Sequence, residues 1–172
     1  PLVLAGAVRH ADDQARLEAL EALAATLPAE HCGGAGGGEG AALVGAVKFA
    51  PNLPLEELRE LFGRARVGLH TMWNEHFGIG VVEMQAAGLA VVAHRSGGPA
   101  LDIIEHGRTG MLAESAEEYA EAMGALLLQP GCEARCREMG AAARRAVSTR
   151  FSEESFAEGL CDALRPLVDF ES

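Results

Sequence analysis

The sequence is poor in basic residues and has no long hydrophobic segment. Its 14 lysines and arginines are outnumbered by 25 aspartates and glutamates, which gives a net charge of −11 and a pI near 4.9. A surface of this sign repels nucleic-acid phosphates, so we do not expect nucleic acid as a partner. No apolar run is long enough to cross a bilayer, and a hydrophobic fraction of 49% is typical of a folded domain.

Patterns typical of metal sites are also missing. The four cysteines include no C-x-x-C pair, and we interpret Cys132 and Cys136, one helical turn apart, as reduced thiols. None of the six histidines has a second histidine four residues away. No Asp-x-Asp motif is present to hold a cation between phosphates. We therefore expect neither a metal site nor a cofactor.

The N-terminal part of the chain alternates strand and helix patterns. The apolar runs Leu2–Val8 and Leu43–Phe49 are typical of strands in a buried parallel sheet. A helical pattern follows each of them, one ending at Pro28 and the other spanning Leu55–Arg64 after Pro54. This order predicts an α/β fold with a Rossmann-like, doubly wound parallel sheet. The length favours one domain over residues 1–172.

Two features of this region stand outside that pattern. Residues 32–40, CGGAGGGEG, precede a strand instead of following one, so they lack the geometry of a phosphate-binding glycine loop. We interpret them as a flexible loop insertion. The sequence begins at Pro1 without a methionine and is expected to be part of a longer protein.

The most informative stretch covers residues 67–99. A short apolar strand, Val67–His70, leads through a polar loop into a helical run, and Gly88 stands where a left-handed cap is needed. A second buried strand, Leu89–Ala93, leads into the loop at residues 94–99. In a strand–loop–helix–strand unit both loops lie at the carboxyl edge of the sheet, where open α/β folds bind ligands. We expect the two loops to form one site.

The residues of this stretch resemble a known enzyme family. Glu75 and Glu83, with seven residues between them, match the E-x7-E signature of the retaining glycosyltransferases of family four, which have the GT-B fold. Within that family, the strings GLHTMWNEHFGIGVVE and AHRSGGPALDI resemble the GDP-mannose-dependent α-1,2-mannosyltransferases of the dolichol pathway. The resemblance extends from Leu2 to about Phe156. It implies the Rossmann-like C-terminal half of a GT-B glycosyltransferase.

The resemblance also implies a donor, an acceptor and a compartment. The donor would be GDP-mannose, from which the whole enzyme transfers mannose with retention to a lipid-linked oligosaccharide, Man3GlcNAc2. This would occur at the cytosolic face of the endoplasmic reticulum membrane. The acceptor is expected to bind an N-terminal domain absent from this chain, so the chain alone is expected to be inactive. Another nucleotide-sugar transferase of the family and a non-catalytic nucleotide-sugar-binding module remain open alternatives.

The resemblance assigns the catalytic roles to Glu75, which would accept hydrogen bonds from sugar hydroxyls, and Glu83, which would accept them from the ribose. Backbone N–H groups at the start of a helix suit a diphosphate, and glycines let the backbone approach its oxygens. The predicted donor-binding residues are Asn74, Glu75, His76, Phe77, Gly78, Ile79, Glu83, Gly97 and Gly98. Arg9 and Lys48 are further candidates, although Arg9 equally fits a solvated or structural arginine.

Several residues of this stretch have a structural alternative. Glu83 also fits a solvated helix glutamate, and Asn74 and His76 also fit roles in shaping the loop. Trp73 fits a packing anchor better than a sugar-stacking platform, and His70 fits a core histidine with satisfied hydrogen bonds.

Downstream, the pattern predicts a short helix after the second loop and a last strand at Met111–Ala113. Ser115 is expected to cap a helix that reaches Gln129, and further helices are expected at Glu133–Val147 and Glu153–Val168. Arg95 stands where the family more often has asparagine, and the sequence assigns it no role.

Overall fold

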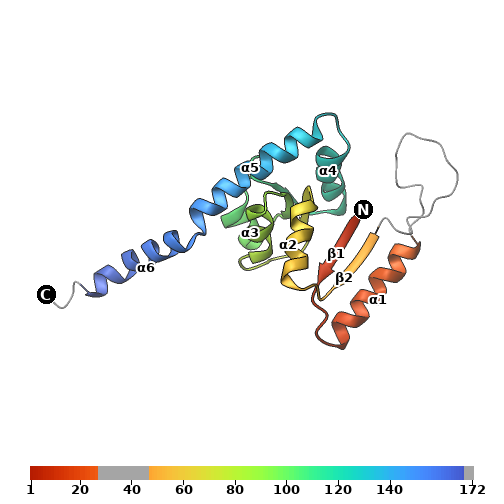
Figure 1. The fold of residues 1–172 in the computed structure, drawn as a ribbon, viewed down its shortest axis with the longest axis horizontal. Coiled ribbons are helices and arrows are strands. Elements are labelled where there is room, and N and C mark those ends of the chain that lie inside the picture. The colour runs from red at the N-terminus through yellow and green to blue at the C-terminus, as the bar shows by residue number, and fades with distance from the viewer. Residues whose placement is uncertain (27–46, 169–172) are drawn as a thin grey trace. The chain divides into compact units, whose positions relative to one another are not determined.

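The computed structural model describes residues 1–26 and 47–168. The chain divides into two compact units, Pro1–Arg59 and Glu60–Ser172, and the boundary falls within helix α2 (Leu55–Arg64). Figure 1 shows the helices and strands of both units. The predicted insertion at residues 32–40 lies outside the described residues, as does the first part of the predicted strand Leu43–Phe49. The expectation of one domain over the whole chain stays a prediction.

Unit 1 contains a two-stranded parallel sheet covered by a helix. Strand β1 (Leu2–Gly6) pairs with β2 (Val47–Pro51), and α1 (Ala11–Thr26) connects to β1 through a short turn. At the start of α1 the Asp13 carboxylate accepts a hydrogen bond from the Arg9 N–H at 3.1 Å, and this bond is the main reason why the pKa of Asp13 is lowered.

The side chain of Asn52 extends the pairing of β1 and β2 beyond both strands. The Asn52 backbone lies in the left-handed region, with φ of 54°. Its side-chain oxygen accepts the Val8 N–H at 2.8 Å, and its amide nitrogen donates to the Val8 carbonyl at 3.3 Å. One amide side chain therefore replaces a strand residue and fixes the chain that leaves β1.

Unit 2 is built on a three-stranded parallel sheet of order β3-β4-β5. Its strands are β3 (Val67–His70), β4 (Ala90–His94) and β5 (Met111–Ala113). Between the strands lie helix α3 (Ile79–Ala86) and a five-residue π-helical turn, η2 (Pro99–Ile103). Three helices follow: α4 (Ala116–Leu127), α5 (Cys132–Arg150) and α6 (Glu153–Val168). Each predicted element of this unit is present within a few residues of its expected ends.

The central strand β4 is buried on both faces. Val91 and Ala93 belong to one apolar cluster with residues of α3 and η2, whereas Ala90 and Val92 belong to a second cluster with residues of α4 and α5. Because successive side chains of a strand point to opposite faces, a run of small and β-branched apolar residues suits this position. The helices on both faces give unit 2 the doubly wound arrangement that the sequence predicted.

Helix α5 packs against the turn that joins α3 to β4. Gly140 of α5 lies so close that a Cβ there would overlap the carbonyl oxygen of Gly88, which has φ of 85° as expected for the cap. The Arg144 guanidinium donates to the carbonyls of Ala86 and Ala87 at 2.8 and 2.7 Å. An arginine of α5 therefore satisfies the orphan carbonyls at the end of α3.

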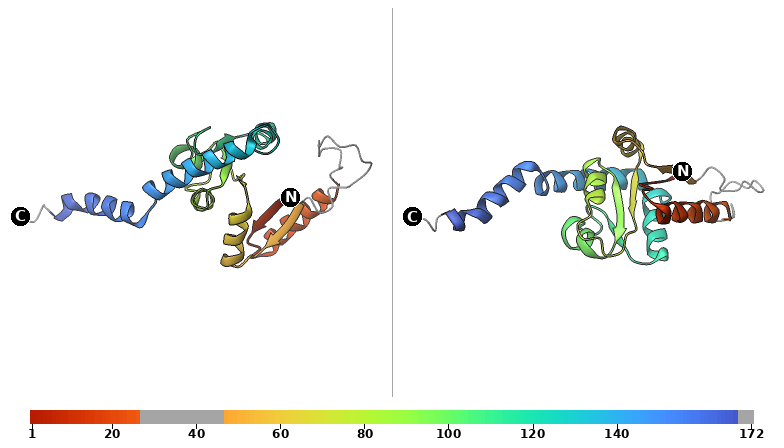
Figure 2. Two further views of the ribbon diagram at one scale, coloured as in Figure 1. Left: turned by 45° about the horizontal axis from the view of Figure 1, so that its top comes forward. Right: turned by 90° about the horizontal axis from the view of Figure 1, so that it is seen from below.

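Helices α5 and α6 follow each other as separate segments, which are visible in both views of Figure 2. Ser152 caps α6 as predicted, because its hydroxyl accepts the Ser155 N–H at 3.1 Å. Phe156, Leu160 and Leu164 of α6 are exposed. Among the helices of the described residues, none has the length and apolar character needed to cross a membrane.

Candidate nucleotide-sugar site

The loops after β3 and β4 meet at the carboxyl edge of the sheet, as the sequence predicted. Strands β3 and β4 are parallel, with His70 beside Ala93. The Gly98 N–H donates to the Glu75 carbonyl at 2.8 Å, and the Asn74 N–H donates to the Ser96 hydroxyl at 2.8 Å. Two hydrogen bonds therefore join the two loops. One connects the predicted site residues Glu75 and Gly98, and the other connects the predicted residue Asn74 to Ser96, which the sequence did not single out.

Glycine is required where the second loop crosses the first. Gly97 has φ of 58°, and a Cβ at this position would overlap the carbonyl oxygen of Glu75. Gly98 has an ordinary helical conformation, but a Cβ there would overlap the carbonyl oxygen of Phe77. The predicted glycines therefore let the backbone of the second loop lie directly against the backbone of the first.

Helix α3 begins with an open N-terminus. Its N-cap, Gly78, has φ of 100° and provides no side-chain cap. The first turn of α3 contains no acidic residue, unlike that of every other α-helix in the described part of the chain. The N–H groups at a helix start carry partial positive charge and need acceptors. This end of α3 is therefore suited to an anionic ligand.

The two glutamates lie on either side of this helix start. Glu75 is in the loop, with 23% of its side chain exposed, whereas Glu83 is exposed on α3 between the buried residues Val82 and Met84. Glu83 therefore avoids the desolvation cost of a buried carboxylate. Both carboxylates remain available as hydrogen-bond acceptors.

The His70 side chain contacts Glu75, but one of its two ring nitrogens has no hydrogen-bond partner in the part of the chain that the structure describes. Its Nε2 lies 3.7 Å from the Glu75 carboxylate, and its Nδ1 is buried without a hydrogen-bond partner among the described residues. The interpretation of His70 as a satisfied core histidine is therefore wrong. Its carbonyl accepts the Tyr119 hydroxyl at 2.9 Å, and burial raises the pKa of Tyr119 to about 12, so Tyr119 remains a neutral donor at neutral pH.

Comparison with known proteins places this geometry in a family. The family model described as glycosyl transferases group 1 matches residues 40–146, which is more than half of the chain. The chain belongs to the group 1 glycosyltransferase family. Its match includes both loops, α3 and both glutamates.

Within this family, the chain is similar to curated proteins that are named as mannosyltransferases. The chain is 44% identical over 158 residues to the human protein named GDP-Man:Man(3)GlcNAc(2)-PP-Dol alpha-1,2-mannosyltransferase, covering 90% of this chain and 29% of that protein. The mouse protein of the same name is 42% identical over 170 residues, covering 97% of this chain and 31% of that protein. The chain therefore spans about three tenths of the length of these relatives.

Solved structures confirm the fold. HepE from Anabaena, in complex with UDP and glucose, matches with a TM-score of 0.74 at 22% identity, over 95% of this chain and 40% of HepE. The C-terminal domain of a group 1 glycosyltransferase from Francisella tularensis matches with a TM-score of 0.67 at 15% identity, over 88% of this chain and 87% of that domain. The prediction of a Rossmann-like α/β fold, as in the C-terminal half of GT-B glycosyltransferases, is confirmed.

The side chains around the candidate site differ in exposure. Trp73 is 73% exposed, so its interpretation as a packing anchor is wrong within the described structure. Ile79 is exposed at the start of α3, as is the predicted donor-binding residue His76. Phe77 packs edge-to-face against Phe151, with ring centroids 5.5 Å apart, and thereby ties the start of α3 to the end of α5.

Arg95 is held away from the loop crossing. Its guanidinium donates to the Glu118 carboxylate at 2.9 Å and to the Leu112 carbonyl at 3.0 Å. Glu118 also accepts the Glu114 N–H. Both hydrogen bonds lower the pKa of the Glu118 carboxyl group, and the bond from Arg95 has the larger effect. Arg95 therefore joins the second loop to the start of α4.

The candidates Arg9 and Lys48 belong to unit 1, where both are exposed. Their approach to the donor stays a prediction, as do the roles of all the predicted site residues. Among the described residues, no group of three or more histidine, cysteine, aspartate or glutamate side chains is arranged to hold a metal ion. The expectation that no cofactor is needed also stays a prediction.

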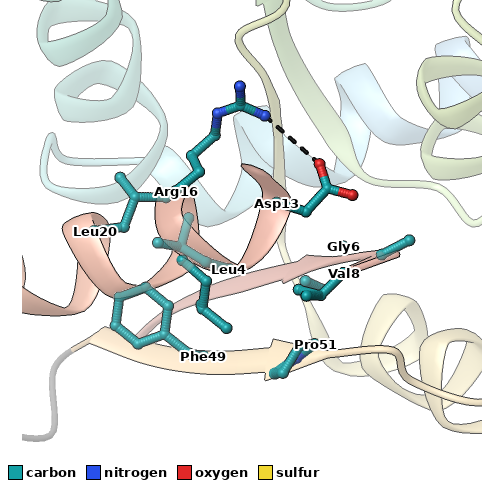
Figure 3. A pocket seen from close by; sticks show the side chains of 11 residues that line it. Leu4, Gly6, Val8, Asp13, Arg16, Leu20, Phe49 and Pro51 are labelled. Atoms are coloured by element: carbon teal, nitrogen blue, oxygen red, sulfur yellow. Dashed lines mark ion pairs between the residues drawn. The ribbon is translucent and has the colours of Figure 1, made fainter. Parts of the chain in front are cut away.

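Unit 1 contains a pocket that the sequence did not indicate. It lies between α1 and the β1–β2 sheet, with a volume of about 250 Å³ (Figure 3). Leu4, Leu20 and Phe49 contribute apolar walls. Its charged residues, Asp13 and Arg16, pair with each other at 3.7 Å. Because its walls are apolar and its two charged side chains form a pair, the pocket does not suit a diphosphate.

Proposed function

We propose that this chain is the donor-binding part of an α-1,2-mannosyltransferase that transfers mannose from GDP-mannose to lipid-linked Man3GlcNAc2. The names of the human and mouse relatives support the reaction and the dolichol-linked acceptor. The observation that carries the proposal is the open N-terminus of α3, with Glu75 and Glu83 on either side of it. The acceptor and its endoplasmic-reticulum setting concern the whole protein, of which the chain spans about three tenths.

The chemistry follows from the charges that develop during transfer. As the bond between mannose and the diphosphate breaks, negative charge grows on the departing phosphate. N–H groups at the start of α3 stabilise that charge, because they are fixed donors at the positive end of the helix dipole. Glycine at positions 78 and 80 lets phosphate oxygens come close to the backbone.

The two carboxylates have separate tasks in this proposal. Glu75, next to the loop crossing, accepts hydrogen bonds from hydroxyls of the mannose ring and orients it. Glu83, at the fifth position of α3, accepts hydrogen bonds from the two ribose hydroxyls of GDP. A carboxylate offers two oxygens, so it can hold adjacent hydroxyls in a bidentate way. Orientation of the anomeric carbon then lowers the barrier for attack by the acceptor hydroxyl.

A second candidate is a nucleotide-sugar transferase of the same family with another donor. The observation that favours it is the shared fold with HepE, whose structure contains UDP and glucose. The two candidates differ in the nucleotide that they recognise. Calorimetric titration of the chain with GDP, GDP-mannose, UDP and UDP-glucose tests them directly. We expect the guanine nucleotides to bind more tightly, and a preference for UDP-glucose would reject the mannosyltransferase proposal.

Paired substitutions test the roles of the carboxylates. Charge-assisted hydrogen bonds contribute about 1.5–3 kcal/mol, so Glu83→Gln should weaken GDP and GDP-mannose binding by a similar amount within that range. Glu75→Gln should weaken GDP-mannose binding and leave GDP binding nearly unchanged. Glu121→Gln on α4, another exposed helix glutamate, serves as the matched control. Equal losses for both ligands at Glu75 would contradict its assignment to the sugar.

A further inference from the structure

The loop that carries Glu75 depends on one hydroxyl group from the other loop. The Ser96 Oγ accepts the Asn74 N–H at 2.8 Å, and Asn74 directly precedes Glu75. The Glu75 carbonyl accepts the Gly98 N–H at 2.8 Å. The backbone on both sides of the Glu75 Cα is therefore tied to the second loop, once by a side chain and once by the backbone.

The conformation of Asn74 shows why the loop needs this support. Asn74 has φ of 52°, a left-handed conformation that non-glycine residues adopt only at some cost. Asparagine tolerates this region better than most residues, but the surrounding structure must still hold it there. The hydrogen bond from its N–H to Ser96 is the contact that holds it. No other acceptor is recorded for this N–H within the described part of the chain.

The Ser96 hydroxyl is itself oriented by His94. The His94 Nδ1 lies 2.9 Å from the Ser96 Oγ, and the Ser96 N–H donates to the His94 carbonyl at 2.8 Å. The Ser96 hydroxyl has one proton and two oxygen lone pairs, so whichever of these faces the ring nitrogen, at least one lone pair remains. That lone pair is then free to accept the Asn74 N–H. The three residues form a chain of hydrogen bonds from the end of β4 to Glu75.

We propose that Ser96 is a positioning residue that fixes Glu75 in its sugar-binding orientation, with His94 orienting the Ser96 hydroxyl. The inference deepens the proposed function and rests on it for the identity of the sugar. The immobilisation of the loop does not rest on it. Loss of the hydroxyl frees Asn74, and Glu75 then samples orientations in which its carboxylate no longer meets the sugar. Donor discrimination by Glu75 therefore depends on a residue of the other loop.

Two measurements test immobilisation without any ligand. The chain has a single tryptophan, Trp73, next to Asn74, so its time-resolved fluorescence anisotropy reports the motion of this loop. Amide hydrogen exchange at Asn74 reports the hydrogen bond itself. In Ser96→Ala we expect exchange at Asn74 to accelerate about fivefold, the size expected for losing one neutral hydrogen bond. The fast component of the Trp73 anisotropy decay should increase as well.

The matched control is Ser115→Ala. The Ser115 hydroxyl also accepts a backbone N–H, that of Glu118 at 3.3 Å, but it lies at the start of α4. This variant loses the same chemical group and should leave Asn74 exchange and Trp73 anisotropy unchanged. Ser96→Thr keeps the hydroxyl and should restore both readouts, which keeps the test valid if Ser96→Ala is less stable. Unchanged exchange in Ser96→Ala, or an equal change in Ser115→Ala, would overturn the inference.

Ligand titration then separates positioning from a general loss of structure. Ser96→Ala should weaken GDP-mannose binding about fivefold while changing GDP binding by less than twofold, because Glu75 acts on the sugar. Ser96→Thr should recover the affinity for GDP-mannose. Equal weakening of both ligands would overturn the positioning role. If no guanine nucleotide binds the unaltered chain, the proposed function fails, and the exchange and anisotropy results still decide whether Ser96 holds the loop.

Discussion

Helices α3 and α4 begin in opposite ways within the same unit. The start of α4 is closed by its own side chains: Ser115 accepts the Glu118 N–H, and Glu117 and Glu118 place negative charge in the first turn. The start of α3 has the left-handed Gly78 as its N-cap and neither a side-chain cap nor an acidic residue. A helix stabilised only for folding resembles α4. The difference between the two helix starts supports the proposal that the N–H groups of α3 bind an anionic ligand.

The largest effect should come from filling the loop crossing beside α3. In Gly98→Ala the new methyl group meets the carbonyls of His76 and Phe77, both of them backbone groups that cannot turn away. We expect a loss of about 3 kcal/mol in unfolding free energy, the upper end of the range for overpacked sites, and no detectable GDP binding. Urea denaturation and calorimetry measure these losses.

The control for this variant is Gly124→Ala in α4, where an added Cβ meets nothing within 4 Å. It should stabilise the chain by up to about 1 kcal/mol, because alanine is more stable than glycine in a helix interior. GDP binding should stay unchanged. Normal GDP binding by Gly98→Ala would show that the glycine crossing is unrelated to the donor site.

The next largest effect should come from giving α3 the charge that α4 has. Gly80 is the second residue of α3, as Glu117 is of α4, and it has open space for a side chain. Gly80→Glu should weaken GDP binding by about 2 kcal/mol, between the ~1 and ~4 kcal/mol of two charges 4 Å apart in water and near a protein surface. Gly80→Gln provides a neutral control of the same shape. If both variants bind GDP equally, the open start of α3 is not the diphosphate site.

A smaller effect is expected from removing the cap of α4. Ser115→Ala should lower the unfolding free energy by about 1 kcal/mol, the usual value of a helix N-cap. GDP affinity should not change, because the N–H groups at the start of α4 are capped by its own side chain and do not serve a ligand. A loss of GDP affinity without a loss of stability would reverse the contrast drawn between the two helices.

The smallest effect concerns pH. The pKa of Glu118 is lowered first by the hydrogen bond from Arg95 and then by that from Glu114, so the folded state favours its ionised form. The resulting stabilisation is present above the ordinary pKa of 4.5 and is lost as the pH falls through the lower folded value. Unfolding of the wild type and Glu118→Gln, compared from pH 7 to pH 3, should show a difference that shrinks below about pH 4.5. A constant difference would assign the effect to shape instead of charge.

Local patterns predicted most of the architecture of unit 2. The strands Val67–His70 and Met111–Ala113 have the predicted ends, because short apolar runs between turn residues leave few alternatives. The two glutamates were predicted from the family resemblance, and the glycines at the loop crossing from the backbone N–H groups of the short helix that they begin; the roles of all four stay predictions. Unit 1 was harder to predict: the helix after β1 was expected, but the amide bridge from Asn52 to Val8 joins residues 44 positions apart.

Contacts between distant residues account for what the sequence did not reveal. Ser96 meets Asn74 across 22 residues, and Tyr119 reaches His70 across 49. Arg95 was left without a role because it lies in a loop and its partner, Glu118, lies 23 residues away on α4. Periodicity identifies the face on which a side chain lies but not the atom that it meets. A serine followed by two glycines in a loop predicted to belong to the site was the signal that could have revealed Ser96.

The bond between Arg144 and the end of α3 changes how natural variants should be interpreted. Arg144 lies on α5, is exposed, and is 58 residues distant in sequence from Ala86. A survey based on exposure alone would class its replacement as harmless. Yet its positive charge lies at the negative end of the α3 dipole, and the positive end of the same helix is the proposed diphosphate site. If the open start of α3 binds the donor as proposed, a variant at Arg144 should weaken donor binding from the opposite end of that helix.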